Sequence, residues 1–183
     1  MLQRAAGLWL WWGLIGAAHA TEQIPDHIRI DGQDAVLLAE PLAPVLDDQA
    51  TWQRFVAHAR PALGSCSANW RGYQADWRVE QTQVLLDRIV IGACDTAPPA
   101  LPLDVLFPGR TAPVAADWID GELVIALPTA ASTGDTAPGA AEAPYLLLQV
   151  QHGRVVTREP LSDEAKLRAR RAQAHVSGAA TTP

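Results

Sequence analysis

The stretch NWRGYQADWRVEQTQVLLDRIVIGA, residues 69–93, decides the fold, because it contains two long β-type runs joined by a polar turn around residues 80–82. In the first run Tyr73, Ala75 and Trp77 alternate with polar residues, which predicts a strand with one buried face. The second run is apolar on both faces apart from Asp87 and Arg88, so the pattern alone does not fix its register. We expect an antiparallel hairpin at the centre of the domain. Gly72, just before the first run, is expected at a bulge or a close backbone approach.

Three further dipeptides predict tight turns on either side of this hairpin. Asp31-Gly32, Asp120-Gly121 and His152-Gly153 each separate two short apolar or alternating segments. Aspartate, histidine and glycine tolerate the positive φ values that two-residue turns require. Each dipeptide therefore predicts one more hairpin.

One segment has helical rather than strand periodicity. In residues 49–59, Trp52, Phe55, Val56 and Ala59 fall on one face at the spacing i, i+3, i+4 and i+7. Asp47 and Asp48 precede this segment and can cap its first N–H groups, and Pro61 ends it. The pattern predicts one amphipathic helix that buries this face, with His58 near it as a packed or solvated side chain.

The fold class that follows is mainly β, an antiparallel meander of about eight strands that forms a small barrel or sandwich. One amphipathic helix is inserted, and a short C-terminal helix is expected from residue 161 onward, followed by a disordered end within 161–183. The β-rich domain is expected to span residues 21–160. Within it, residues 128–143 are small, Pro- and Gly-containing and poor in apolar bulk, which predicts a flexible loop.

The N-terminus predicts export. Arg4 precedes an apolar run too short to span a bilayer as a helix, and Ala18-His19-Ala20 suits cleavage before Thr21. We therefore expect residues 1–20 to be a signal peptide and the product to be periplasmic or secreted, without a stable membrane anchor. The net charge of −6 disfavours nucleic acid as a partner.

The two cysteines flank the central hairpin. If Val79 faces residue 83 or 84 across the turn, Cys66 and Cys94 lie within a few residues of register. In an oxidising compartment this spacing favours a Cys66–Cys94 disulfide. The alternative, a nucleophilic Cys66, needs a nearby base, and no histidine stands at a spacing that supplies one.

Aromatic and charged residues around the central hairpin are the candidate binding site. Tyr73 and Trp77 share the core-facing side of their strand with Arg71, and a buried arginine needs an acidic or carbonyl partner. Asp117 and Glu122, on either side of the predicted Asp120-Gly121 turn, are candidate partners. The candidate binding residues are Arg71, Tyr73, Trp77, Asp117, Trp118 and Glu122. An internal salt bridge that fixes the domain is the structural alternative.

The sequence has no catalytic motif and no paired metal-ligand spacing, so no catalytic residue, metal site or cofactor is expected. The chain is more consistent with a binding protein than with an enzyme.

Asn69 to Trp77 in the pattern N-W-R-G-Y-x-A-x-W, followed by L-F-P at 106–108 and A-D-W-x-x-G-E-L at 116–123, resembles a family of small uncharacterised bacterial proteins. The resemblance covers about residues 27–158 apart from the flexible loop. It implies a shared β fold and does not point to any particular activity.

Three functions remain in competition. The first is an exported, non-enzymatic binding or interaction protein, for example one that blocks another protein as periplasmic immunity proteins do. The second is a barrel that holds a small molecule against Arg71, Tyr73 and Trp77. The third is a hydrolase that uses Asp117 and Glu122 as a carboxylate pair, although five residues across a turn do not establish the separation such chemistry needs.

Overall fold

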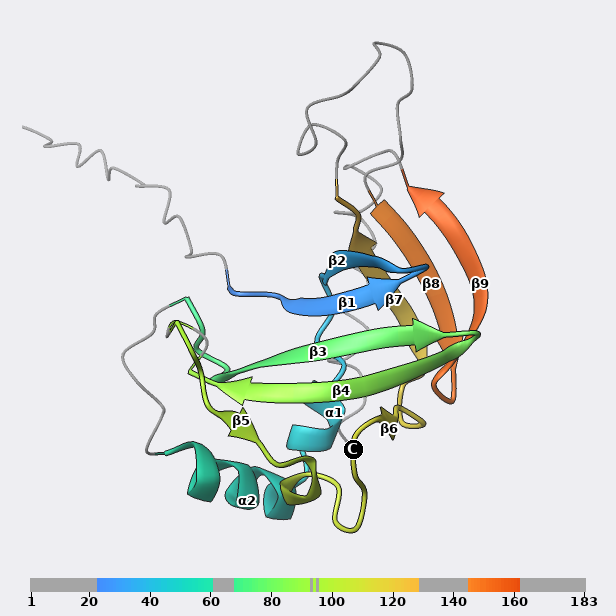
Figure 1. Ribbon diagram of the computed structural model, residues 1–183. Helices are drawn as coiled ribbons and strands as arrows, with labels where there is room; N and C mark the ends of the chain where they lie inside the picture. Colours follow the sequence, from blue (N-terminus) through green and yellow to red (C-terminus); the bar gives the residue numbers. More distant parts are fainter. Residues whose placement is uncertain (1–22, 61–67, 93, 95, 129–144, 162–183) are drawn as a thin grey trace, which may run out of the picture.

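The chain forms a closed β-barrel of seven strands, with two extra strands and two short helices (Figure 1). The computed structural model describes residues 23–60, 68–92, 94, 96–128 and 145–161. The strands are β1 (Asp26–Ile30), β2 (Gln33–Leu37), β3 (Tyr73–Glu80), β4 (Gln83–Ile91), β5 (Ala100–Leu101), β6 (Val114–Ala115), β7 (Gly121–Ala126), β8 (Tyr145–Gln151) and β9 (Arg154–Leu161). The helices are α1 (Ala43–Leu46) and α2 (Gln49–Ala59), with a 3-10 turn η1 at Leu103–Val105.

The strand order around the barrel is β3-β1-β2-β7-β8-β9-β4, and β4 returns to pair with β3. The short strands β5 and β6 both pair with β4 outside this ring. The prediction of a mainly β fold is confirmed, and the fold is a barrel rather than a sandwich. The prediction of an antiparallel meander is wrong, because β1 runs parallel to β3 and β2 lies next to β7.

Two of the predicted outer hairpins are confirmed. Asp31 and Gly32 join β1 to β2 with φ values of 51° and 79°, and His152 and Gly153 join β8 to β9 with 48° and 72°. Both central positions of each turn lie in the left-handed region that two-residue hairpins use. Local turn chemistry therefore determines these two connections.

The hairpin predicted at Asp120-Gly121 is wrong. The segment before this dipeptide contains only the two-residue strand β6, which pairs with β4, and the chain then turns at Ala116, whose carbonyl accepts from Ile119 N at 3.0 Å. Gly121 begins β7, whose partner is β8 along its whole length. β7 therefore pairs with the longer apolar strand β8 and not with the segment just before Asp120, which the turn signal had suggested as its partner.

The central hairpin forms as predicted but contains a bulge. Near the turn Val79 faces Val84 and Trp77 faces Leu86, whereas beyond the bulge Asp76 faces Arg88. Asp87 is the extra residue on β4. The bulge lies between Asp76 and Trp77 rather than at Gly72, which has a φ of 77° in the turn before β3.

The barrel interior is filled by large apolar side chains. The largest fully buried side chains in the described part of the chain come from strands all around the barrel and from the helical segments: Trp77, Phe55, Ile28, Leu37, Leu42, Leu86, Ile89, Ile125, Leu148, Val84, Val114 and Val150. Burial of this apolar surface is the main stabilising contribution to such a domain.

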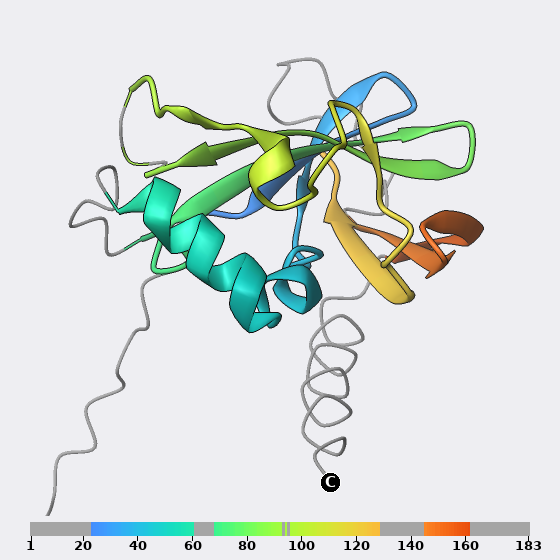
Figure 2. The same ribbon diagram turned by 90° about the horizontal axis from the view of Figure 1, so that it is seen from below.

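Helix α2 lies across one side of the barrel, where Figure 2 shows it in front of the strands. Its bounds and its Asp48 cap are as predicted, with the Asp48 carboxylate accepting from Thr51 N at 2.8 Å. Phe55 packs edge-on against Tyr73, with ring centroids 6.0 Å apart. Trp52 differs from the prediction, because it is 46% exposed. Thr51 is buried instead, and its hydroxyl donates a hydrogen bond to Asp48 and accepts one from Arg54.

Several predictions fall outside the described residues. These are the signal peptide, nearly all of the 128–143 loop, the C-terminal helix and tail, and Cys66. The Cys66–Cys94 disulfide therefore stays a prediction.

Candidate functional site

Asp26, the first residue of β1, is the most deeply buried polar residue in the described part of the chain. Its carboxylate is fully buried and accepts three hydrogen bonds: from Arg71 Nη2 at 3.2 Å, Ala75 N at 3.1 Å and Trp77 Nε1 at 3.0 Å. The parallel pairing of β1 with β3 places Asp26 beside these three donors. A buried carboxylate is stable only when such donors replace the water it has lost.

Burial and hydrogen bonding act in opposite directions on this carboxyl. Burial raises the pKa of Asp26, and the Arg71 charge with the Trp77, Ala75 and Arg71 hydrogen bonds opposes that rise without cancelling it. Burial also raises the pKa of the neighbouring Tyr73 phenol. The guanidinium of Arg71 lies 4.8 Å from the centre of the Tyr73 ring, a cation–π contact.

The partners of Arg71 differ from those expected. Besides Asp26, Arg71 Nη2 donates to the carbonyl of Ile24 at 2.7 Å, and Nε lies 4.0 Å from a Glu40 oxygen. Asp117 instead forms an exposed ion pair with Arg110 at 3.1 Å. Glu122 is an exposed residue of β7. The expectation that Asp117 or Glu122 pairs with Arg71 is therefore wrong.

Trp118 belongs to the edge of the same aromatic core. Its ring stacks on Phe107 with centroids 4.7 Å apart, lies 6.4 Å from Trp77, and donates from Nε1 to the Pro41 carbonyl at 2.9 Å. Of the six candidate residues the structure thus brings Arg71, Tyr73 and Trp77 together, with Trp118 beside Trp77, and leaves Asp117 and Glu122 elsewhere. The arrangement around Asp26 fits a structural role, a buried salt bridge that stabilises the fold, because Asp26, Arg71 and the aromatic residues beside them are buried.

A second group of polar residues lies on the outer face of the barrel. It lines a groove of about 770 Å³ that crosses β1, β2, β3 and β4 and the end of β7. Its lining residues are His27, Ile28, Arg29, Asp34, Ala35, Val36, Asp76, Trp77, Arg78, Asp87, Arg88, Ala126, Leu127 and Pro128. We call it the outer groove.

Ion pairs between neighbouring strands organise the outer groove. Arg29 Nε donates to Asp34 at 2.8 Å, Arg78 Nη1 lies 2.9 Å from Asp87, and Arg88 Nε donates to Asp76 at 2.8 Å. The hydrogen bond and charge of Arg29 lower the pKa of Asp34. Opposite charges on facing strand positions stabilise an exposed sheet surface modestly and hold the side chains in place.

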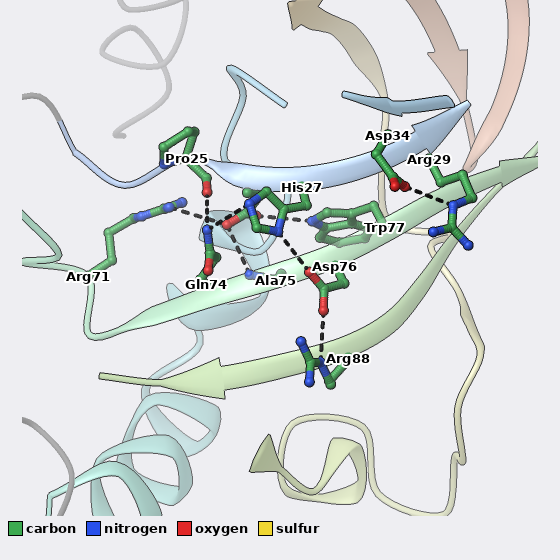
Figure 3. A network of polar contacts seen from close by, with 11 residues as sticks. Pro25, His27, Arg29, Asp34, Arg71, Gln74, Ala75, Asp76, Trp77 and Arg88 are labelled. Carbon is green, nitrogen blue, oxygen red and sulfur yellow. Dashed lines mark hydrogen bonds and ion pairs between the residues drawn. The ribbon is translucent and has the colours of Figure 1, made fainter. Parts of the chain in front are cut away.

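His27 links two of these strands. Its Nδ1 lies 3.2 Å from Asp76 Oδ1, and its Nε2 lies 3.3 Å from the side-chain nitrogen of Gln74, which also donates to the Pro25 carbonyl (Figure 3). Because a carboxylate only accepts, this geometry fits the tautomer with hydrogen on Nδ1 and with Nε2 accepting from Gln74.

The β4 bulge is what gives the groove its charge density. Without an extra residue, adjacent residues of a strand point to opposite faces, and either Asp87 or Arg88 would point into the barrel. With the bulge, Arg88 is exposed opposite Asp76, while Asp87 is half-buried and pairs with Arg78. Neither charge enters the core.

Neither Asp26 nor the outer groove is predicted by the sequence patterns. The signal for the groove was present, because His27 and Arg29 alternate with isoleucines just as Asp76 and Arg78 alternate with apolar residues. Nothing local, however, indicated that these two polar faces become neighbours.

No group of three or more metal-ligating side chains occurs in the described part of the chain. Within those residues no helix is long and apolar enough to cross a membrane. No family model, curated protein or solved structure matches the chain.

Proposed function

We propose that this chain is an exported, non-enzymatic binding protein that contacts a partner protein through its outer groove, in the manner of periplasmic immunity proteins that block another protein. One observation carries the proposal: apolar side chains fill the barrel interior, whereas charged side chains that can form further hydrogen bonds line a groove on its outer face. Pairing between strands holds that surface rigid, so a partner would not have to order it.

The small-molecule alternative has weaker support. It needs space between Arg71, Tyr73 and Trp77, yet each of these residues is at most 7% exposed, and Asp26 occupies the polar end of the cluster. Seven strands make a narrow barrel, in which side chains alone fill the interior.

The hydrolase alternative is also weaker. Asp117 is held by Arg110 on the surface, and neither Asp117 nor Glu122 lines the outer groove. A carboxylate pair needs a cleft between its two members.

Site-specific photocrosslinking tests the proposed surface in cells that express the full chain. A photoreactive amino acid replaces Val36, which lines the groove, and in a matched control it replaces Val156, which is 49% exposed on β9 and outside the groove. We expect one discrete protein adduct from position 36 that excess unlabelled parent protein suppresses. Equal adducts from both positions, or none from position 36, would count against a groove-mediated interaction.

Export is tested separately on the protein recovered from the periplasm or the medium. We expect an intact mass that corresponds to a chain starting at Thr21, with both Cys66 and Cys94 unreactive to alkylation unless a reductant is added. A retained N-terminal segment would contradict the signal peptide, and two thiols that react without reductant would contradict the disulfide.

A further inference from the structure

Two arginines of the outer groove have hydrogen-bonding capacity that their present partners do not use. Arg29 is held to Asp34 and Arg88 to Asp76, in both cases through Nε at 2.8 Å. Their side chains are 64% and 60% exposed. Within the described residues no acceptor is bonded to the terminal nitrogens of either arginine, so each retains its Nη1–Nη2 edge for another molecule.

Each aspartate of the groove already faces a cationic or imidazole partner. Asp76 receives His27 on one oxygen and Arg88 on the other, while Asp87 pairs with Arg78 and Asp34 with Arg29. The Nη1–Nη2 edges of Arg29 and Arg88 therefore remain as donors that none of these three aspartates uses. A molecule that complements these edges has to bring acceptors, and carboxylates fit the parallel N–H groups of a guanidinium edge best among protein side chains.

The two arginines lie on one face of the sheet at a defined separation. His27, Asp76 and Arg88 form one row across β1, β3 and β4, and Arg29 stands two residues farther along β1. Two strand spacings across the sheet and two residues along it give roughly 12 Å between the Cα atoms. Residues four apart in an extended chain are separated by roughly 13 Å.

We infer that the outer groove binds an acidic segment of a partner protein, in which two carboxylates about four extended residues apart accept from the Nη groups of Arg29 and Arg88. The inference rests on the proposed function and adds the chemistry of the partner to it. A protein segment fits better than a polyanion, because the chain carries a net charge of −6 and each groove arginine is already paired with a carboxylate. Fixed ion pairs also orient the two guanidinium groups before binding, which reduces the entropy lost on association.

The test is an NMR titration of the full secreted chain with a defined probe. The probe is a capped Gly/Ser peptide that carries two glutamates four residues apart, and the readout is the Nε–Hε signals of the arginines. We expect saturable shifts at Arg29 and Arg88 and none at Arg110, which lies outside the groove and pairs with Asp117. A peptide with glutamines in place of the glutamates should bind about fivefold more weakly, as the loss of two exposed charge pairs implies.

Variants connect the signal to the two side chains. The Arg29→Gln/Arg88→Gln double variant should bind the glutamate peptide as weakly as the parent binds the glutamine peptide, whereas Arg110→Gln should bind like the parent. Backbone amide spectra establish that each variant is folded. If the double variant does not fold, the single variants Arg29→Lys and Arg88→Lys replace it, because lysine keeps the charge but loses the fork and should weaken binding measurably.

Three results would overturn the inference: equal affinity for the two peptides, unchanged affinity in the folded glutamine or lysine variants, or saturation of the same signals by inorganic phosphate at the same concentration as the glutamate peptide. The last result would identify a general anion surface. The crosslinking experiment at position 36 does not depend on carboxylates. A specific adduct there combined with a failed titration would reject the acidic segment and leave the proposed function in place.

Discussion

Asp26 and Arg71 form the one buried ion pair in the described residues whose two members are both almost inaccessible, with side chains 0% and 5% exposed. Replacing Arg71 by Met removes the charge that faces the carboxylate and leaves Asp26 buried with only neutral donors. Breaking a buried pair in this way costs about 3 kcal/mol or more in the free energy of unfolding. Urea denaturation of Arg71→Met beside the parent measures the loss.

Arg110→Met is the matched control, since its partner Asp117 is 58% exposed and an exposed pair contributes less than about 1 kcal/mol. If Arg71→Met lowered the free energy of unfolding no more than this control does, Arg71 would not form a stabilising internal salt bridge. Its face with Tyr73 and Trp77 would then become the first place to look for a ligand.

The direction of the Asp26 pKa gives a second expectation at this residue. Because the folded-state pKa is raised above the unfolded value of about 3.9, the folded protein holds this proton more tightly than the unfolded chain does. The resulting stabilisation is fully present below the unfolded pKa and is lost as the pH rises through the folded pKa. Asp26→Asn lacks this titration, so the parent should gain free energy of unfolding relative to Asp26→Asn between pH 7 and about pH 4.

Urea melts of both proteins at the two pH values provide the measurement, and the other titrating groups act on both proteins alike. A relative loss for the parent on acidification would mean that the donors from Arg71, Ala75 and Trp77 outweigh burial.

The residue-scale features differ in how far the sequence could predict them. The alternation of apolar and polar residues was sufficient to predict that Tyr73, Ala75 and Trp77 are buried, because strand periodicity is a local property. The partner of Arg71 was not predictable, since Asp26 lies 45 residues away and reaches it only through the parallel pairing of β1 with β3. Asp117 was the wrong candidate because the hairpin expected to carry it does not form.

At the scale of elements, Gly153 joins three parts of the barrel at the β8–β9 turn. Its N–H donates to Ile119 O at 2.9 Å, and its carbonyl accepts from Val84 N at 2.8 Å and from the Gln83 side chain at 3.0 Å. A methyl group added there would meet the backbone of Ala116, with the carbonyl carbon at 2.7 Å, and the residue already has a φ of 72°. We expect Gly153→Ala to destabilise the protein by more than about 3 kcal/mol.

Gly32→Ala separates the steric clash from the backbone conformation. Gly32 has a similar φ of 79°, but an added Cβ there has no neighbour within 4 Å. The left-handed conformation alone costs about 1–2 kcal/mol for a residue with a side chain. Thermal melts of the two variants should therefore show a clearly larger loss at position 153, and equal losses would mean that the Ala116 segment moves aside freely.

The element scale also shows where local patterns mislead. Hairpin turns at Asp31-Gly32 and His152-Gly153 follow from turn chemistry, whereas the same chemistry at Asp120-Gly121 only precedes a strand. The β4 bulge was hidden for a related reason. In the sequence, the adjacent charges of Asp87 and Arg88 left the strand register undetermined, because regular alternation would point one of them into the core. The extra residue of the bulge keeps both charges out of the core.

At the scale of the whole molecule, the barrel closes through a few contacts between segments distant in sequence. Only Val36 and Leu37 of β2 pair with β7, and β9 pairs with β4 at a single position, Arg154 opposite Gln83. Arg158 of β9 adds an ion pair with Asp31 in the β1–β2 turn at 2.9 Å. Alternation and turn signals predict strands but not these partners, which is why the sequence left barrel and sandwich open.

The connection between β7 and β8 should be replaceable without loss of stability. Ala126 pairs with Tyr145, so the barrel already holds the two ends of this connection side by side. Replacing residues 129–143 by Asn-Gly leaves a short hairpin loop. A shorter loop has a smaller entropic cost of closure, which should stabilise the fold by about 1 kcal/mol. Thermal melts should show no decrease in Tm, while a Gly/Ser segment of the original length should leave Tm close to that of the parent. A decrease of more than about 10 °C in both variants would instead mean that residues 129–143 contribute packing that their composition does not suggest.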